Sequence, residues 1–166
     1  MESWRRIFQN DDYWVSDHGN VKYGVEKMSL RDLHGYRSVY LSGHGSHRVH
    51  RLVWSTFKGE IPDGMQIDHK DRVRDNNHLA NIRVGTPSQN QANRARQRNN
   101  TSGLAGIGRK WGRDMWRARV KCRGKTYEKT FKTTAEAERW RLVTKRDLFG
   151  DWLPYEDKKR IKDLRL

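Results

Sequence analysis

The chain has 166 residues, 34% of them hydrophobic, and its 35 Lys and Arg against 20 acidic residues give a net charge of +15. This composition favours two or three small modules over one large core, and the charge favours a polyanionic partner, nucleic acid first. We find no apolar run long enough to span a bilayer and no cleavable signal, so we expect a soluble intracellular protein without a membrane partner. The single cysteine, Cys122, excludes an internal disulfide and a zinc site built on paired cysteines.

The N-terminal part, residues 1–45, is predicted to be a small β module. Short alternating runs such as Tyr13–Ser16 and Tyr36–Leu41 are typical of strands. Residues 47–58 then carry apolar side chains at helical spacing and are followed directly by Gly59. This pattern predicts an amphipathic helix with a glycine stop.

The central part, residues 46–98, is predicted to run helix, strand, loop, strand, helix. Met65–His69 has the form of a short strand, and Ile82 and Val84 indicate a second one after a polar loop. Pro87 stands at a favourable first helical position, which predicts a helix to about Arg96. We expect the active site in this domain.

The C-terminal part, residues 99–152, is predicted to be a small sheet covered by a helix. Trp116–Cys122 alternates apolar with cationic residues, as strands do, and a capping box at Thr133 starts the helix that Gly150 ends. The positive charge is concentrated here, because residues 91–132 hold 13 Lys or Arg and only two acids. Residues 153–166 are expected to form a charged tail, frayed or loosely helical.

Four polar residues of the central domain are candidates for cutting a phosphodiester: Asp68, His69, Asn81 and Asn90. The reaction needs a nucleophilic water, a proton acceptor and a cation. Asp68 suits a hard cation, Mg²⁺ or Mn²⁺, and His69 can accept a proton near neutral pH. Asn90 could be a second oxygen ligand, and Asn81 could accept the other N–H of His69 and so orient the ring. We expect one ion per active site.

These residues also have ordinary structural interpretations. An isolated Asp–His pair is more often a turn with a capping aspartate, and Asn81 and Asn90 could be a turn residue and a solvated helix residue. The linked occurrence of all four favours the active site. His44, His47 and His50 are spaced by three, but no cysteine or carboxylate joins them, which disfavours a zinc site.

Cationic side chains are expected to contact DNA phosphates or base edges. The predicted DNA-binding residues are Arg51, Arg94, Arg98, Arg109, Arg117, Arg119, Lys121 and Arg123. A solvated sheet face is the alternative for the cationic strand, although like charges side by side are costly without a partner.

Five linked sequence blocks occur at fitting separations within residues 47–98: Val49–Val53, Ile67–Asp71, Asn76–Asn77, Asn81–Val84 and Gln89–Asn93. In these blocks the chain resembles the HNH homing endonucleases of phages and introns. The resemblance implies an α+β protein with a central ββα-metal (His-Me finger) unit. It also implies that Asp68 and Asn90 bind the metal, that His69 is the general base and that Asn81 positions it. Asn90 stands where histidine is commoner, a variant that this subfamily resembles.

Two flanking stretches extend the resemblance. Residues around Trp4, Tyr13–Asp17 and Gly35–Tyr36 are similar to an N-terminal module that often precedes such nuclease units. Asn100–Gly103 and Trp116–Arg119, with the helix after them, resemble an Apetala-type (ethylene-response) DNA-binding domain. Such domains lay a three-stranded sheet in the major groove.

The sequence therefore predicts a metal-dependent DNA endonuclease of homing type. It is expected to bind double-stranded DNA as a monomer, to nick one strand per active site and, by resemblance, to work in the cytoplasm of a bacterial host. The alternative is a sequence-specific DNA-binding regulator with an inactive nuclease scaffold, against which the intact Asp68, His69 and Asn90 argue. A basic protein that coats nucleic acid is disfavoured, because helix caps and an alternating strand indicate defined modules.

Overall fold

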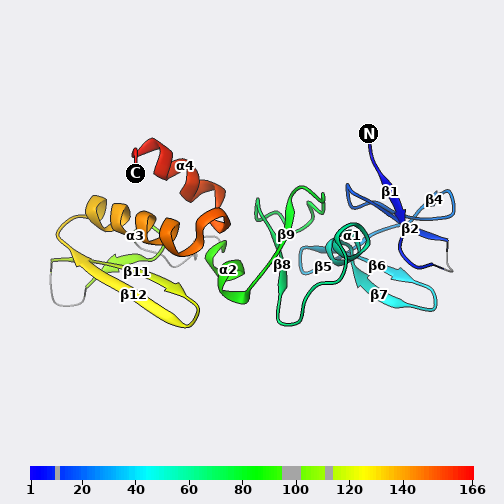
Figure 1. The fold of residues 1–166 in the computed structure, drawn as a ribbon, viewed down its shortest axis with the longest axis horizontal. Helices are drawn as coiled ribbons and strands as arrows, with labels where there is room; N and C mark the ends of the chain where they lie inside the picture. The colour runs from blue at the N-terminus through cyan, green and yellow to red at the C-terminus, as the bar shows by residue number, and fades with distance from the viewer. Residues whose placement is uncertain (10–11, 95–101, 111–113) are drawn as a thin grey trace. The chain divides into compact units, whose positions relative to one another are not determined.

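A computed structural model of the chain describes residues 1–9, 12–94, 102–110 and 114–166. The chain forms two compact units, Met1–Thr86 and Pro87–Leu166 (Figure 1). Each unit combines strands with helices, so the predicted α+β class is confirmed. The boundary at residue 86 falls within residues 46–98, where the sequence predicted a single domain.

The described residues of the first unit form three small antiparallel sheets and one helix, with sheet orders β1-β2-β3-β4, β5-β6-β7 and β8-β9. The elements are β1 Trp4–Arg6, β2 Tyr13–Ser16, β3 Val21–Tyr23, β4 Glu26–Lys27, β5 Arg31–Leu33, β6 Tyr36–Leu41, β7 Gly45–Arg48, α1 Val49–Lys58, β8 Gln66–His69 and β9 Ile82–Gly85.

One apolar core joins these elements. Val15 from β2 and Leu41 from β6 are fully buried, because alternate residues of each strand point inward. Helix α1 adds a buried stripe of Val49, Leu52 and Val53. The strands before residue 45 thus share their core with α1, whereas the sequence predicted a separate module. The helix also begins two residues later than predicted, because Gly45–Arg48 pairs with β6 as β7.

The second unit is a three-stranded antiparallel sheet, in the order β10-β11-β12, combined with helices, as predicted. The elements are α2 Pro87–Ala92, β10 Ile107–Arg109, β11 Trp116–Cys122, β12 Lys125–Phe131, α3 Thr134–Phe149, the short 3-10 helix η1 Gly150–Trp152 and α4 Tyr155–Asp163. Helix α2 ends at Ala92, earlier than predicted, because Asn93 and Arg94 are not helical; the predicted end, Arg96, lies outside the described residues.

Helix α3 covers the apolar side of β11. Thr133 and Glu136 form the predicted capping box, and Gly150 is the C-cap. Trp140 packs against both small clusters of this unit, one around Ala118 and one around Val120, so its interpretation as a core residue is confirmed.

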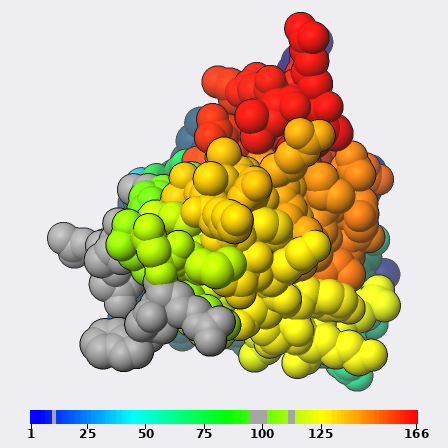
Figure 2. Space-filling model, turned by 90° about the vertical axis from the view of Figure 1, so that its left-hand side faces the viewer, coloured from blue at the N-terminus to red at the C-terminus, as the bar shows by residue number. Residues whose placement is uncertain are grey.

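The C-terminal segment is the ordered helix α4, which packs on α3 (Figure 2). Asp157 of α4 pairs with Arg141 at 3.5 Å and with Lys145, and Arg160 pairs with Glu138 at 2.9 Å. The sequence predicted a frayed or loosely helical tail here. No helix in the described parts of the chain combines the length and apolar content needed to cross a membrane.

Candidate active site

Asp68 and His69 lie at the end of β8 and are almost completely buried, with exposed fractions of 6% and 5%. Pairing with β9 places Asp68 opposite Arg83 and His69 opposite Ile82. Because neighbouring residues of a strand point to opposite sides, the two side chains diverge, as the sequence predicted.

The imidazole of His69 is held by Asn77. Its Nε2 donates to the Asn77 Oδ1 at 3.1 Å, and Asn77 is itself buried. An amide oxygen only accepts hydrogen bonds, so the proton sits on Nε2 and the basic lone pair of the neutral ring is on Nδ1. This hydrogen bond favours the tautomer in which the lone pair lies on Nδ1.

The sequence prediction gave this orienting contact to Asn81, and the structure corrects it. The Asn81 Nδ2 donates to the Asp71 Oδ1 at 2.9 Å and to the Asn76 carbonyl at 2.8 Å, and its Oδ1 accepts from the Asp71 N–H at 3.2 Å. Asn81 therefore holds the loop between β8 and β9 closed. It affects the position of the His69 ring indirectly, through that loop. Asn77 belongs to a block that carried the family resemblance, but the sequence analysis gave it no role.

Asp71 anchors the same loop. Burial acts to raise the pKa of its carboxyl group, but hydrogen bonds from the Val73 N–H and from the side chains of Asn81 and Asn76 outweigh burial, and the pKa is lowered overall. The carboxylate is therefore ionised at neutral pH and holds the loop that carries Asn77.

The turn between β2 and β3 packs against this loop. Gly19 has a φ of +84°, and a Cβ atom there would lie 2.6 Å from the Asn77 Cβ. The Leu79 N–H donates to the Asp17 carbonyl at 2.7 Å, and the His18 and His78 rings lie 4.3 Å apart. The absence of a side chain at Gly19 is thus a condition for the position of Asn77.

Asp68 forms a buried ion pair with Arg83. The Arg83 Nη2 and Nε lie 2.9 and 3.0 Å from the Asp68 Oδ2. A carboxylate and an amide oxygen are the donor types that Mg²⁺ and Mn²⁺ prefer, so Asp68 and Asn90 fit such an ion chemically. A cation at Asp68 would compete with Arg83 for the carboxylate.

The second predicted ligand, Asn90, is half-buried in α2 and belongs to the second unit. Its joint role with Asp68 as a metal ligand stays a prediction. Among the described residues, no three His, Cys, Asp or Glu side chains cluster as metal ligands. A site at Asp68 would therefore rely on amide, water or phosphate oxygens.

Two further rings pack beside His69. The His50 ring lies 5.1 Å from the His69 ring, and Tyr36 lies 5.3 Å from His50 and 6.0 Å from His69, measured between centroids. The His50 Nδ1 is buried without a hydrogen-bond partner in the described part of the chain. Burial, and then the charges of His69, Arg48 and Arg51, lower the pKa of His50 to about 3. His50 is therefore neutral at physiological pH.

The histidines at the start of α1 have different partners. His44 stacks on Phe8 at 3.9 Å, and the His47 Nε2 bonds to the His44 carbonyl at 3.0 Å. Only His50 faces His69. The three rings thus have different neighbours in the described part of the chain.

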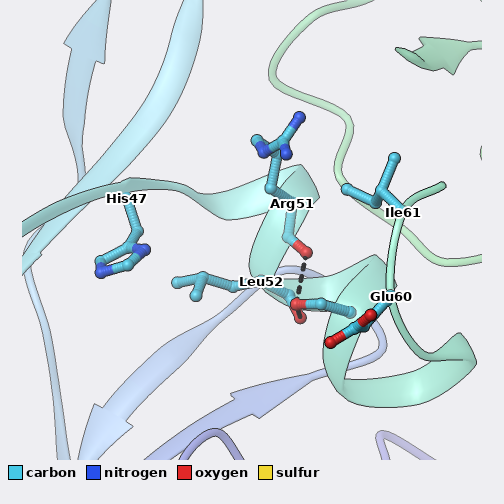
Figure 3. A pocket seen from close by; sticks show the side chains of 6 residues that line it. His47, Arg51, Leu52, Glu60 and Ile61 are labelled. Carbon is cyan, nitrogen blue, oxygen red and sulfur yellow. Dashed lines mark hydrogen bonds between the residues drawn. The ribbon is translucent and has the colours of Figure 1, made fainter. Parts of the chain in front are cut away.

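Arg51 is exposed on α1 and lines a surface hollow with His47, Leu52, Ser55, Glu60 and Ile61 (Figure 3). Ser55 donates to the Arg51 carbonyl at 2.8 Å, so the backbone of this turn is fixed while the guanidinium projects outward. Neither His50 nor His69 lines this hollow, so it is a feature separate from the buried centre.

The other predicted DNA-binding residues lie in the second unit. Arg94, Arg109, Arg119 and Lys121 are exposed and Arg117 is half-exposed, whereas Arg98 lies outside the described residues. Arg119 pairs with Glu128 at 3.0 Å across the sheet.

The position of Arg123 differs from the predicted one. It was expected on the cationic face of the strand, but β11 ends at Cys122, and Arg123, with a φ of +48°, forms the hairpin turn with Gly124. Its backbone N–H donates to the Ser88 Oγ at 2.9 Å.

Comparisons with known proteins place the centre in a family. Residues 47–92 match the HNH endonuclease family. Protein 3.8 of Escherichia phage T7 is 34% identical over 116 residues, which cover 70% of this chain and 96% of that protein. YosQ of Bacillus subtilis (strain 168) is 29% identical over 93 residues, 52% of this chain and 54% of that protein. Its name assigns it to HNH homing endonucleases of SPbeta prophage origin without establishing its activity.

A solved structure, described as DNA binding and cleavage by the HNH homing endonuclease I-HmuI, is similar at 30% identity and a TM-score of 0.48. The similarity covers 55% of this chain and 56% of that one. The chain thus spans about half the length of YosQ and of this endonuclease, and nearly all of Protein 3.8. The matched residues 47–92 contain Asp68, His69, Asn77, Asn81 and Asn90, and the chain belongs to the HNH endonuclease family.

Proposed function

We propose that the protein is a metal-dependent endonuclease that hydrolyses a phosphodiester of duplex DNA and cuts one strand per active site. The observation that carries the proposal is the buried His69, whose ring is fixed by Asn77 beside Asp68 within the residues matched to the family. A buried histidine with an assigned tautomer is poised for one proton transfer.

In the proposed reaction, the Nδ1 of His69 takes a proton from a water molecule, and the water oxygen attacks the phosphorus. The P–O bond to the leaving strand breaks, and the leaving oxygen takes a proton from a second water molecule. The Asn77 Oδ1 accepts a hydrogen bond from the Nε2–H throughout and stabilises the imidazolium that forms. Asp68 and Asn90 would hold a Mg²⁺ or Mn²⁺ ion, which when bound neutralises phosphate charge and the leaving oxygen. Asn81 keeps the loop closed while the proton moves.

Binding of the duplex is proposed for the second unit. Its three-stranded sheet with a covering helix offers an exposed cationic strand for this purpose. The comparisons do not support the predicted Apetala-type DNA-binding domain, because the family match ends at residue 92. Arg119 and Lys121 project from the exposed side of β11, where a DNA backbone or base edge would be met. We propose that the protein acts as a monomer that cuts one strand, since the described residues of the chain hold one candidate centre.

The biological setting is also a proposal. The similarity to a phage protein and to a prophage protein supports action on DNA inside a bacterial cell. The name of YosQ supports a homing function, in which the enzyme cuts a defined site so that its own coding element is copied there.

The direct test is a plasmid-nicking assay. Supercoiled plasmids that carry fragments of phage and bacterial genomes are incubated with the wild type, His69→Ala and the control His47→Ala, in Mg²⁺ or EDTA. We expect Mg²⁺-dependent relaxation by the wild type and the control and none by His69→Ala, with DNA binding retained. If no plasmid is cut in any divalent metal, the protein is a DNA-binding protein with an inactive scaffold.

A further inference from the structure

Two arginines stack on one tyrosine next to His69. The guanidinium carbons of Arg48 and Arg74 lie 4.8 and 5.0 Å from the ring centroid of Tyr36. The Tyr36 ring is 6.0 Å from the His69 ring and 5.3 Å from that of His50. We call Tyr36, Arg48 and Arg74 the Tyr36 stack. It places two positive charges at the edge of the proposed catalytic centre.

Three separate segments of the first unit build the Tyr36 stack. Tyr36 begins β6 after a two-residue turn, His34–Gly35, in which both φ angles are positive, +57° and +80°. Arg48 is the last residue of β7, directly before α1. Arg74 comes from the loop between β8 and β9, and its Nη1 donates to the His34 carbonyl at 3.0 Å. The convergence of these segments fixes both guanidiniums against one ring.

The charge of the Tyr36 stack is not compensated. Among the described residues, neither Arg48 nor Arg74 has an acidic partner, whereas the nearby Arg37 pairs with Asp75 at 3.8 Å and Arg83 pairs with Asp68 at 2.9 Å. Tyr36 is half-buried, while both arginines are exposed, so their free N–H edges reach solvent. A guanidinium stacked on a ring keeps its donors available for the two oxygens of a phosphate.

We propose that Arg48 and Arg74 of the Tyr36 stack bind a backbone phosphate of the DNA strand next to the phosphate that His69 attacks. The identity of the ligand as DNA rests on the proposed function. Tyr36 is a positioning residue, because it holds the two arginines and does not itself touch the phosphate. The stack would fix the cut strand relative to the Nδ1 of His69, which lowers the cost of orienting the reacting groups.

Salt dependence of DNA binding tests the two arginines. A short fluorescent duplex of arbitrary sequence is titrated with full-length protein in EDTA, at NaCl concentrations from about 50 to 200 mM. The double variant Arg48→Gln/Arg74→Gln is expected to lower the slope of log K against log salt by about 1, the contribution of one phosphate contact, and each single variant by part of that amount. Arg5→Gln is the matched control, because its guanidinium lies 4.8 Å from the Phe57 centroid in the same unit. The control should keep the wild-type slope.

Tyr36 is tested with two variants. Tyr36→Phe keeps the ring and is expected to bind DNA like the wild type, whereas Tyr36→Leu frees both guanidiniums and is expected to bind several-fold more weakly at a nearly unchanged salt slope. Thermal unfolding of each variant establishes that the first unit is folded. If the folded Tyr36→Leu variant binds DNA as tightly as the wild type, Tyr36 has no positioning role and does not hold the two arginines for DNA binding.

The outcomes separate this inference from the proposed function. If the arginine variants lose slope but the wild type cuts no plasmid, the phosphate site stands and catalysis is refuted. If the wild type cuts DNA and both arginine variants bind and cut as it does, the phosphate site is refuted and the function stands. A wild type that does not bind duplex DNA at all overturns both.

Discussion

Asn77 is an uncharged residue in a polar loop, yet the orientation of His69 depends on it. Asn77→Ala should lower the cleavage rate about 10–100-fold, as loss of a residue that orients a functional histidine typically does. Asn77→Asp is the informative companion, because its carboxylate still accepts from Nε2 and makes the ring more basic. We expect that variant to retain cleavage, with the acidic limb of the pH–rate profile moved to higher pH. Equal rates for Asn77→Ala and the wild type would contradict this role.

Arg83 gives a test of metal binding that does not depend on activity. Arg83→Gln leaves the buried Asp68 carboxylate without its cationic partner, which should lower the free energy of unfolding by about 3–5 kcal/mol without metal. Added Mn²⁺ should then raise the midpoint of thermal unfolding more in this variant than in the wild type, because the ion binds only the folded state.

The control for this experiment is Asp68→Asn combined with Arg83→Gln. The double variant lacks the carboxylate and should show no Mn²⁺-dependent rise. The same rise with and without Asp68 would mean that the ion binds elsewhere.

At the scale of elements, the turn between β2 and β3 supports the loop of the active centre. Gly19→Ala introduces a Cβ that would lie 2.6 Å from the Asn77 Cβ. Gly43→Ala is the control, because Gly43 has a similar φ of +77° but no atom within 4 Å of the added Cβ. Both variants share the backbone strain of about 1 kcal/mol. Only Gly19→Ala should lower the free energy of unfolding, measured in urea, by roughly a further 1–3 kcal/mol. The same variant should also lose cleavage activity.

Elements with local signals were predictable from the sequence. The buried stripe of α1, the alternation of β11 and the capping box at Thr133 each depend on residues within one turn or one strand. The position of Asp68 and His69 at the end of a strand was predictable for the same reason, because the pattern of that strand is local.

What the sequence did not predict depends on distant contacts. Asn77 reaches His69 only because the loop is closed by Asp71 and Asn81 and supported by Gly19. Helix α4 has few apolar residues, and its ion pairs with α3 join residues 12 to 22 positions apart. No local periodicity encodes such pairs.

At the scale of the whole molecule, stability depends on pH. His50 is buried in the unit of residues 1–86, so the free energy of unfolding is expected to fall in acid. Its pKa is about 3 when folded and 6.5 in the reference state, so between these values only the unfolded chain takes up the proton. The contribution of neutral His50 to the free energy of unfolding is fully present above about pH 6.5. It is lost as the pH falls toward 3, by about 1.4 kcal/mol per pH unit.

Urea unfolding across this pH range, with His50→Gln as comparison, measures this effect. The variant should show a shallower loss of stability on acidification, whatever its stability at neutral pH. Parallel pH curves for the two proteins would exclude His50 as a source of acid sensitivity.

The central claim is that His69 takes the proton from the attacking water, and chemical rescue tests it most directly. His69→Gly removes the base and opens space for added imidazole. We expect that this variant does not cut plasmid DNA in Mg²⁺ alone and regains cleavage as the imidazole concentration rises, while Asp68→Asn is not rescued. Cleavage by His69→Gly at the wild-type rate without imidazole would contradict the account.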